Sequence, residues 1–271
     1  MQDHTMIYHP KKGIKGKVRF LAIAAHHDDI EIMATDGILR SLQGEGAFVG
    51  VVVTDGGGSA RDGKFRNYTD EMMKQVRIKE QKRAADLGKY QDIVFLNFPS
   101  EKVKASDASV RMAMKRVITR LQPEFIYTHN LCDKHPTHVA VAHQLIQTIN
   151  ALPADAKPKA LYGVEVWRDL DWMSDDEKVV FDVSKGKRLT QRQLLAHQSQ
   201  VAGGKRYDLA TIGRRSAHAT YHASHSVDQS SQLIYAMDLT PLIDGREKSI
   251  RAFVQAKMER FVQDVLNQIN E

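Results

Sequence analysis

Four apolar runs rich in β-branched residues alternate with helical patterns through the first 150 residues, and this alternation constrains the fold more than any other feature. The runs span Val18–Ala25, Phe48–Thr54, Asp92–Phe98 and Phe125–Thr128. Nearly continuous apolar strands that alternate with helices are typical of a parallel sheet whose two faces are both covered. The pattern therefore predicts an α/β fold, a Rossmann-like and mostly parallel sheet with helices on both faces.

Helical periodicity fills the segments between these runs, at roughly residues 31–43, 69–87, 107–121 and 136–150. Gly44, Gly46 and Gly88 follow the first two of these segments, where a residue that ends a helix is expected. Beyond residue 150 the pattern is less regular. It contains short strand-like runs, a helical segment at 190–201 and an amphipathic helix in the tail that begins at Gly245.

Composition excludes several classes of protein. No run of eighteen apolar residues occurs, and the N-terminal segment lacks the apolar stretch of a signal peptide. The single cysteine, Cys132, rules out an internal disulfide bond and fits a reducing compartment. We therefore expect a cytoplasmic protein with no membrane contact. The net charge is +6, but the basic residues are scattered and aromatics make up only 7%, so nucleic acid is not the expected partner. A generally basic surface could still attract an anionic substrate.

Polar side chains gather where three of the four apolar runs end. The first run ends in AHHDD, the second in TDGGGS and the fourth in THNLCDKHPTH. In open α/β sheets, ligands bind outside the carboxyl ends of the strands. The histidines and aspartates of these three segments are therefore expected to converge on one edge of the sheet.

The AHHDD segment is better suited to a cation than to a phosphate. A nucleotide-binding turn at this position would be rich in glycine, whereas Asp28 and Asp29 would repel a phosphate. His26 and Asp29 are three residues apart across a strand-to-helix turn, so both can point at one ion. One aspartate could instead cap the following helix, but capping does not explain an adjacent pair preceded by histidines.

The fourth run leads into a helix that opens with two histidines. Pro136 suits the first helical position, which makes His135 the cap and places His138 in the first turn. The positive end of the helix dipole disfavours imidazolium and keeps His138 able to bind a metal. Two histidines and one carboxylate with an open fourth position form a typical catalytic zinc site, although Fe²⁺ could occupy the same ligands.

These motifs resemble those of the LmbE-like, or PIG-L, N-acetylglucosaminyl deacetylases. That family carries AHPDD after its first strand and HPDH after its fourth, where this chain has AHHDD and HPTH. The segments TDGG, VRIKEQKRAADLG and HQSQ resemble further elements of the family, so the resemblance covers roughly residues 17–200.

The resemblance implies a role for each residue of the two motifs. His26, Asp29 and His138 would be the zinc ligands, and Asp28 would be the general base. His135 would polarise the carbonyl, stabilise the oxyanion or protonate the leaving amine.

Two further residues are expected to bind the substrate. Arg77 is expected to help hold the sugar, although with Glu80 it could simply form a surface pair on a helix. Asp55 lies in a glycine-rich loop that is expected to border the pocket.

The chain departs from the family pattern at three positions. His27 replaces a proline, Thr137 replaces the aspartate between the two histidines, and Ser100 stands where many members place a substrate-binding aspartate. The aspartate missing at Thr137 would orient His135. We expect Asp133, two residues before His135, to act as the substitute carboxylate.

Two features of the second half remain open. His218, His222 and His225 have helical spacing, which fits a second metal site, a segment that covers the substrate, or an ordinary surface stretch. The apolar stripe of the tail helix could pack on its own domain or make a homo-oligomer contact.

The combined prediction is a zinc-dependent hydrolase that removes an N-acetyl group from an N-acetylglucosamine-type sugar or conjugate. The partner would be a small N-acetylated sugar. The alternative is a catalytically impaired member that binds a metal or a sugar, and a non-haem iron oxygenase is disfavoured because it would need a β-rich scaffold. We expect one domain over residues 1–271, in which residues 1–150 form the metal-site half and residues 151–271 shape the substrate pocket.

Overall fold

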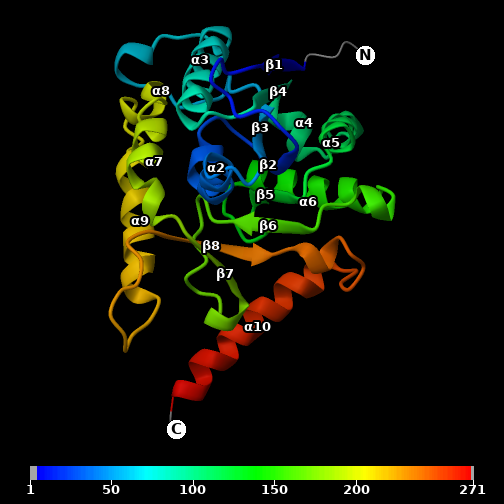
Figure 1. The fold of residues 1–271 in the computed structure, drawn as a ribbon, viewed down its shortest axis with the longest axis vertical. Coiled ribbons are helices and arrows are strands. Elements are labelled where there is room, and N and C mark those ends of the chain that lie inside the picture. Colours follow the sequence, from blue (N-terminus) through cyan, green and yellow to red (C-terminus); the bar gives the residue numbers. More distant parts are fainter. Residues whose placement is uncertain (1–4, 270–271) are drawn as a thin grey trace.

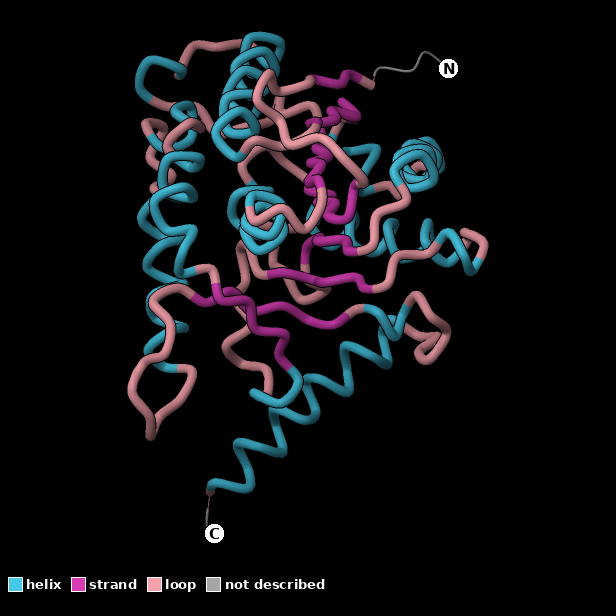
Figure 2. The backbone as a smooth tube through the Cα atoms, viewed as in Figure 1, coloured by secondary structure: helices cyan, strands magenta, loops and turns pink. Residues whose placement is uncertain are grey.

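The computed structural model describes residues 5–269, and the strands within this range form one eight-stranded sheet (Figure 1, Figure 2). The order across the sheet is β1-β4-β3-β2-β5-β6-β8-β7. The strands are β1 (Met6–Tyr8), β2 (Val18–Ala24), β3 (Ala47–Thr54), β4 (Asp92–Phe98), β5 (Phe125–His129), β6 (Ala160–Val164), β7 (Lys178–Asp182) and β8 (Leu233–Asp238). The strands from β4 to β6 in this order run parallel, whereas β1 and β8 pair antiparallel with their neighbours. The predicted mostly parallel α/β sheet is confirmed.

Helices cover both faces of this sheet (Figure 1). They are α1 (Asp29–Met33), α2 (Thr35–Leu42), α3 (Asp70–Gly88), α4 (Ser100–Lys104), α5 (Ala108–Leu121), α6 (Pro136–Asn150), α7 (Lys187–Leu194), α8 (Gln198–Val201), α9 (Tyr207–Tyr221) and α10 (Ile250–Gln268). Successive residues of a strand point to opposite faces. In β2, Leu21 and Ile23 therefore join the core beneath α5 and α6, while Phe20 and Ala22 join the core beneath α2 and α3.

The strand order reverses between β2 and β5, which makes this the topological switch point of the sheet. Phe20, Leu21 and Ala22 of β2 pair with Phe125, Ile126 and Tyr127 of β5. A switch point leaves a crevice at the carboxyl ends of its two strands because the following helices lie on opposite faces. The segment 25–29 and the segment 130–138 both leave the sheet at this crevice.

The helix predicted over residues 31–43 is broken at Ala34 into α1 and α2. Arg215 of α9 is buried and donates hydrogen bonds to the carbonyl oxygens of Glu31 (3.1 Å) and Ile32 (2.8 Å). Carbonyls at the end of a helix need such donors when they are buried. The break is thus satisfied by a residue more than 180 positions away, which local periodicity could not indicate.

The terminal helix α10 extends away from the rest of the protein (Figure 1). Near its beginning Phe253 is buried in the core, and Phe261 contacts Trp172 with ring centroids 6.2 Å apart. Farther along, Val262, Val265 and Leu266 are exposed. The predicted packing on its own domain therefore holds for the first part of the helix, and the homo-oligomer contact stays a prediction. Among the described residues, no helix combines the length and apolar character needed to cross a membrane.

Truncation of the core under β5 should destabilise both halves of the chain together. Ile126 is fully buried, and we expect Ile126→Ala to lower the free energy of unfolding by about 2–5 kcal/mol. Because β5 pairs with β6, the unfolding transition seen by fluorescence of Trp167 and Trp172 should shift together with the transition seen by circular dichroism.

Val262→Ala, on the exposed part of α10, is the control and should change the stability by less than about 0.5 kcal/mol. Two separate transitions would show that residues 151–271 unfold independently.

Candidate functional site

Three nitrogen and oxygen atoms meet in the crevice between β2 and β5. His26 Nδ1 lies 3.0 Å from His138 Nε2, although the two residues are 112 positions apart. Asp29 Oδ2 lies 3.3 Å from His26 Nδ1 and 3.4 Å from His138 Nε2. The three residues named from the two sequence motifs therefore form one cluster.

The spacing of these atoms fits a tetrahedral ion. With bonds of about 2.0–2.1 Å, two ligand atoms of a tetrahedral zinc site lie about 3.3–3.4 Å apart. The three observed separations, 3.0, 3.3 and 3.4 Å, are close to that value. Burial lowers the pKa of His26 to about 4, so this imidazole is neutral at pH 7 and its lone pair is available to a metal. The donor set and its geometry fit a divalent metal.

Asp133 orients one of these histidines, but not the one that the sequence indicated. Its Oδ2 lies 3.2 Å from His138 Nδ1, whereas its Oδ1 accepts the backbone N–H of His135 at 3.0 Å. The Asp133 carboxylate thus binds the backbone of His135 and makes no hydrogen bond to its imidazole ring. A carboxylate on the outer nitrogen of a ligating histidine fixes its tautomer and leaves the other nitrogen free for the metal.

His135 stands beside the cluster, with its ring centroid 4.7 Å from that of His26 and 4.6 Å from that of His138. Its Nδ1 is buried and has no hydrogen-bond partner among the described residues. Burial lowers the pKa of His135 to about 4, with smaller contributions from the neighbouring histidines. The ring is therefore neutral at pH 7 and can donate an N–H to a bound molecule.

His129, at the end of β5, is a member of the cluster that the sequence analysis did not single out. Its Nε2 lies 3.5 Å from Asp29 Oδ2, and Asp29, His129 and His138 form a second possible ligand set that shares Asp29 and His138 with the first. However, His129 Nε2 accepts the backbone N–H of Ala25 at 2.8 Å. Its lone pair is therefore engaged, which makes His129 a less suitable ligand than His26.

Asp28 is held in a strained turn by a buried arginine. Its φ of 89° lies in the left-handed region, a conformation that is costly for most residues and clusters at functional sites. Arg77 donates to Asp28 Oδ2 at 2.7 Å and also to the carbonyl oxygen of His27. Arg77 is 2% exposed, so it does not form a surface pair, and its guanidinium positions Asp28. Arg77 also lines the cavity, and its contact with a sugar stays a prediction.

The second half of the chain completes this support. Glu80 accepts from Arg77 at 3.1 Å and from the backbone N–H of Ser199 at 2.6 Å. The HQSQ segment thus fixes the arginine that fixes Asp28. His27, which replaces a proline, adds no polar contact: its ring is buried, stacks on Phe95 with centroids 5.7 Å apart, and has both nitrogens without partners among the described residues.

A buried glutamate, Glu31, supports the backbone of Asp28 through Gln81. Glu31 of α1 accepts hydrogen bonds from Gln81 (2.9 Å) and Tyr90 (2.7 Å), and it lies 3.1 Å from His197 Nε2. Gln81 in turn accepts the backbone N–H of Asp28 at 3.1 Å. Sequence reasoning missed Glu31, although a charged residue at an apolar helix position is the signal that could have found it.

A cavity of about 600 Å³ opens onto the cluster and is lined by His26, Asp28, Asp29, His135 and Thr137. Its outer wall includes Ser100 and residues from α4, the 202–206 loop and α9. Asp55 is not among the lining residues, because its carboxylate is held by Lys74 (3.1 Å) and by the backbone N–H of Gly57 (3.1 Å). The loop around Asp55 borders the cavity through Gly56 and Gly58.

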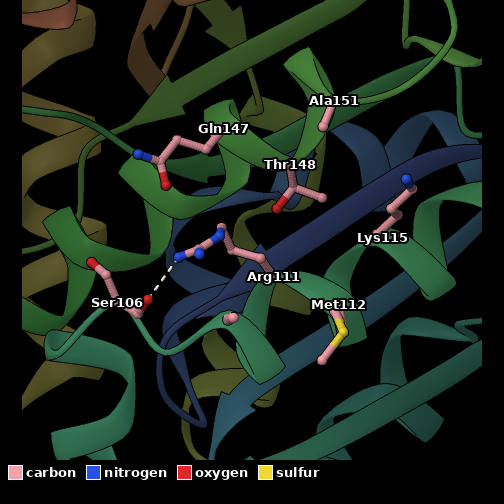
Figure 3. A pocket seen from close by; sticks show the side chains of 8 residues that line it. Ser106, Arg111, Met112, Lys115, Gln147, Thr148 and Ala151 are labelled. Carbon is pink, nitrogen blue, oxygen red and sulfur yellow. Dashed lines mark hydrogen bonds between the residues drawn. The ribbon is translucent and has the colours of Figure 1, made fainter.

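Other candidate regions carry no comparable chemistry. A shallow hollow between α5 and α6 is lined by Arg111 and Lys115, without a histidine or carboxylate among its lining residues (Figure 3). Arg111 is hydrogen-bonded to the carbonyl oxygen of Ser106 at 2.6 Å. Among the described residues, the histidines at 218–225 form no candidate metal cluster. The His218 imidazole pairs with Glu165 at 3.0 Å and stacks on Tyr235, whose hydroxyl lies 3.1 Å from His222 Nδ1.

The comparisons with known proteins agree with this arrangement. Residues 21–149 match the model of the PIG-L family, described as GlcNAc-PI de-N-acetylase, and both metal motifs lie within the matched range. Over these residues the chain is similar to the PIG-L, LmbE-like family. No curated protein has a significant sequence match to the chain.

Several solved structures share the fold. The 4-carboxy-2-hydroxymuconate hydratase GalB from Pseudomonas putida KT2440 is 18% identical, covers 82% of this chain and 96% of its own, and gives a TM-score of 0.65. For N,N'-diacetylchitobiose deacetylase from Pyrococcus horikoshii the values are 16%, 83%, 86% and 0.64. For a zinc-inhibited form of teicoplanin deacetylase they are 14%, 81%, 97% and 0.57. At these identities the likeness shows the fold.

Removal of the charge on Asp133 should weaken metal binding without removing a ligand. We expect Asp133→Asn to lower zinc affinity by about 10–100-fold, because the outer carboxylate raises the basicity of His138 and fixes its orientation. Competition with a chromophoric chelator measures the effect. Asp155→Asn, at an exposed position outside the site, is the control. An unchanged affinity would mean that His138 does not bind the metal.

Proposed function

We propose that the protein is a metal-dependent amide hydrolase that removes the acetyl group from an N-acetylglucosamine-type sugar or conjugate. The observation that carries this proposal is the group of three ligand atoms from His26, Asp29 and His138, which lie 3.0–3.4 Å apart. The neighbouring carboxylate of Asp28 lines the same cavity and is not one of these ligands. The match of residues 21–149 to the GlcNAc-PI de-N-acetylase model supports the same reaction.

In this proposal His26, Asp29 and His138 hold the ion, with Zn²⁺ as the expected metal and Fe²⁺ as the alternative. A divalent ion bound there would lower the pKa of a water molecule and polarise a carbonyl group. The zinc-inhibited form of teicoplanin deacetylase associates zinc with a protein of the same fold. Inhibition by zinc leaves open which metal supports activity, so the choice of zinc rests on the donor set.

Asp28 is proposed as the general base. It is adjacent to Asp29 in the chain and lines the cavity, and Arg77 fixes one of its oxygens at 2.7 Å. The carboxylate would take a proton from water as the water oxygen attacks the carbonyl carbon. When the C–N bond breaks, the same proton would pass to the leaving nitrogen, so that acetate and the free amine are the products.

His135 is proposed to act on the carbonyl oxygen. Because its pKa is lowered to about 4, it would meet the substrate as a neutral imidazole at pH 7 and donate a hydrogen bond to the developing oxyanion. A neutral ring is a poor acid, so protonation of the leaving amine falls to Asp28. Thr137, which replaces the family aspartate, is buried beside the cavity and supplies no carboxylate for His135.

We also propose that residues 1–271 act as one domain, because β6, β8 and β7 extend the same sheet and the 197–199 segment holds Arg77 and Glu31. The second candidate is a catalytically impaired protein that binds a metal or a sugar. The absence of an aspartate at Thr137 favours it, and an assay of turnover separates the two.

The general-base role can be tested without disturbing the strained turn. Asparagine tolerates the left-handed conformation, so Asp28→Asn should fold and bind zinc normally. We expect acetate release from N-acetylglucosamine and its glycosides to fall by about 10²–10⁴-fold, the usual contribution of a general base. Asp155→Asn should keep full activity. Equal activity of the Asp28 variant and the unchanged protein would contradict the role, and no acetate release from the unchanged protein would favour the binding-only candidate.

Zinc binding should release a proton from Asp29 in mildly acidic solution. Burial raises the pKa of Asp29 to about 7, so the metal-free protein holds this proton up to neutral pH, whereas an unfolded aspartate loses it near 3.8. Stability of the metal-free protein should therefore decrease as the pH rises from about 4 to 7. Calorimetry in two buffers of different ionisation enthalpy should detect close to one proton more at pH 6 than at pH 8. An identical proton release at both values would contradict this view of Asp29.

A further inference from the structure

The outer part of α10 carries a stripe of apolar side chains that are 40–55% exposed. The members of this apolar stripe are Met258, Phe261, Val262, Val265, Leu266 and Ile269. Nearly half of the exposed large apolar side chains among the described residues lie in this one stretch, which extends away from the sheet (Figure 1, Figure 2). Single exposed apolar residues are ordinary, whereas a contiguous patch marks an interaction surface.

A different side of the same helix is anchored to the body of the protein. Lys257 pairs with Glu177 at 2.8 Å, and Arg260 pairs with Asp176 at 2.9 Å. Each residue of an α-helix is turned by about 100° from the one before it. The members of the apolar stripe that follow Lys257 and Arg260 therefore point away from the 176–177 segment. The helix is held in place while the stripe faces outward.

The spacing of the apolar stripe matches the seam of a short two-stranded coiled coil. Positions 258, 262, 265 and 269 are separated by four, three and four residues, which is the heptad spacing of the seam. Phe261 and Leu266 flank this seam on its two sides and widen it. The stripe is therefore shaped to pack against one further helix.

An antiparallel second copy of α10 matches the apolar stripe position by position. With a two-fold axis between residues 263 and 264, the facing pairs of the two copies are Met258 with Ile269, Phe261 with Leu266, and Val262 with Val265. The charged residues of the same stretch face uncharged ones, which pairs Glu259 with Gln268, Arg260 with Asn267, and Asp264 with Gln263. The surface is thus complementary to itself, as a two-fold symmetric interface requires.

A parallel pair of helices fits less well. The heptad spacing continues backwards from Met258 to Gln255 and Arg251, so a parallel pair in register would place Arg251 of one copy against Arg251 of the other. Two like charges that face each other across a seam repel. The antiparallel pair leaves Arg251 outside the paired stretch 258–269 and places the bodies of the two copies at opposite ends.

The charge of the stretch favours a second copy of the chain over a lipid surface. Residues 258–269 include one basic and two acidic residues, whereas helices that lie on membranes carry many lysines and arginines on their polar face. Six side chains that are about half exposed present about 500 Å² per copy, so a pair would bury about 1,000 Å². That area is close to the lower limit for a specific interface, which predicts a reversible association.

We propose that two copies of the protein associate reversibly through antiparallel α10 helices, with the apolar stripe as the interface. The inference does not rest on the proposed deacetylase function, because no residue of α10 lines the cavity at the metal site. Both copies therefore keep an open site. In the dilute monomer the stripe stays exposed, so that Val262→Ala changes the association rather than the stability of the fold.

Sedimentation velocity of the full chain tests the proposal. We expect the monomer to convert to a dimer as the concentration rises from the low to the high micromolar range. A monomer at every concentration overturns the proposal. So does a monomer that binds vesicles of phosphatidylcholine and phosphatidylserine, because the stripe would then be a membrane contact.

A matched pair of double variants locates the interface. Val262→Gln with Val265→Gln should raise the dissociation constant of the dimer by about ten-fold or more and leave the circular dichroism spectrum unchanged. Met112→Gln with Leu195→Gln removes exposed apolar side chains outside α10 and should associate as the unchanged protein does. If the first variant associates as tightly as the unchanged protein, or if both weaken the dimer equally, the stripe is not the interface and the proposal fails.

Disulfide cross-linking tests the direction of the two helices. A disulfide needs Cα atoms within about 7 Å of each other. The antiparallel pair brings position 258 to position 269 of the other copy but leaves the two copies of position 258 about 16 Å apart. We therefore expect a covalent dimer in a mixture of the Met258→Cys and Ile269→Cys proteins, and none with either protein alone. The unchanged protein, which keeps Cys132, is the control. A covalent dimer of Met258→Cys alone would contradict the antiparallel arrangement.

Discussion

The parallel pairing of β2 with β5 is the contact on which the site depends. Both strands are buried on both faces, so a slip of one residue would exchange the side chains that point to the two cores, and the register from Phe20–Phe125 to Ala22–Tyr127 is strongly specified. Because of this register, β2 and β5 end level with each other, so the segments that follow them start side by side at the same edge of the sheet. The segments 25–29 and 130–138, which follow these two strands, therefore form one site.

The fold and the identity of the clustered residues could largely be predicted from the sequence, because both follow from local signals. Apolar runs mark the buried strands, Pro136 marks a helix start, and the carboxyl ends of parallel strands share one edge. What failed were contacts made by distant residues. Arg77 looks exposed in a helix rich in charges, and its burial depends on the 197–199 segment that packs over it. The choice of Asp133 between His135 and His138 depends on a loop conformation that spacing does not reveal.

The fold by itself leaves the chemistry open. A hydratase and several deacetylases share this arrangement of sheet and helices with the chain at identities below 20%. The function therefore has to be argued from the site, where the ligand geometry and the spare carboxylate at Asp28 carry the weight. A buried hydrogen-bond network holds Asp28 in its left-handed backbone conformation. Arg77, which pairs with Glu80, binds its carboxylate, and Gln81, which pairs with Glu31, binds its backbone N–H.

A single oxygen, Asp133 Oδ2, serves both His138 and the backbone of Trp167. One consequence concerns how such an enzyme could change its substrate during evolution. Substitutions that shift residues 166–167 would also move Asp133 and thereby disturb His138, so a change of substrate made through these residues would impair the proposed metal site. Variation on α9 and the 202–206 loop avoids that coupling, and related chains that handle different molecules should diverge there first while Asp133 stays constant.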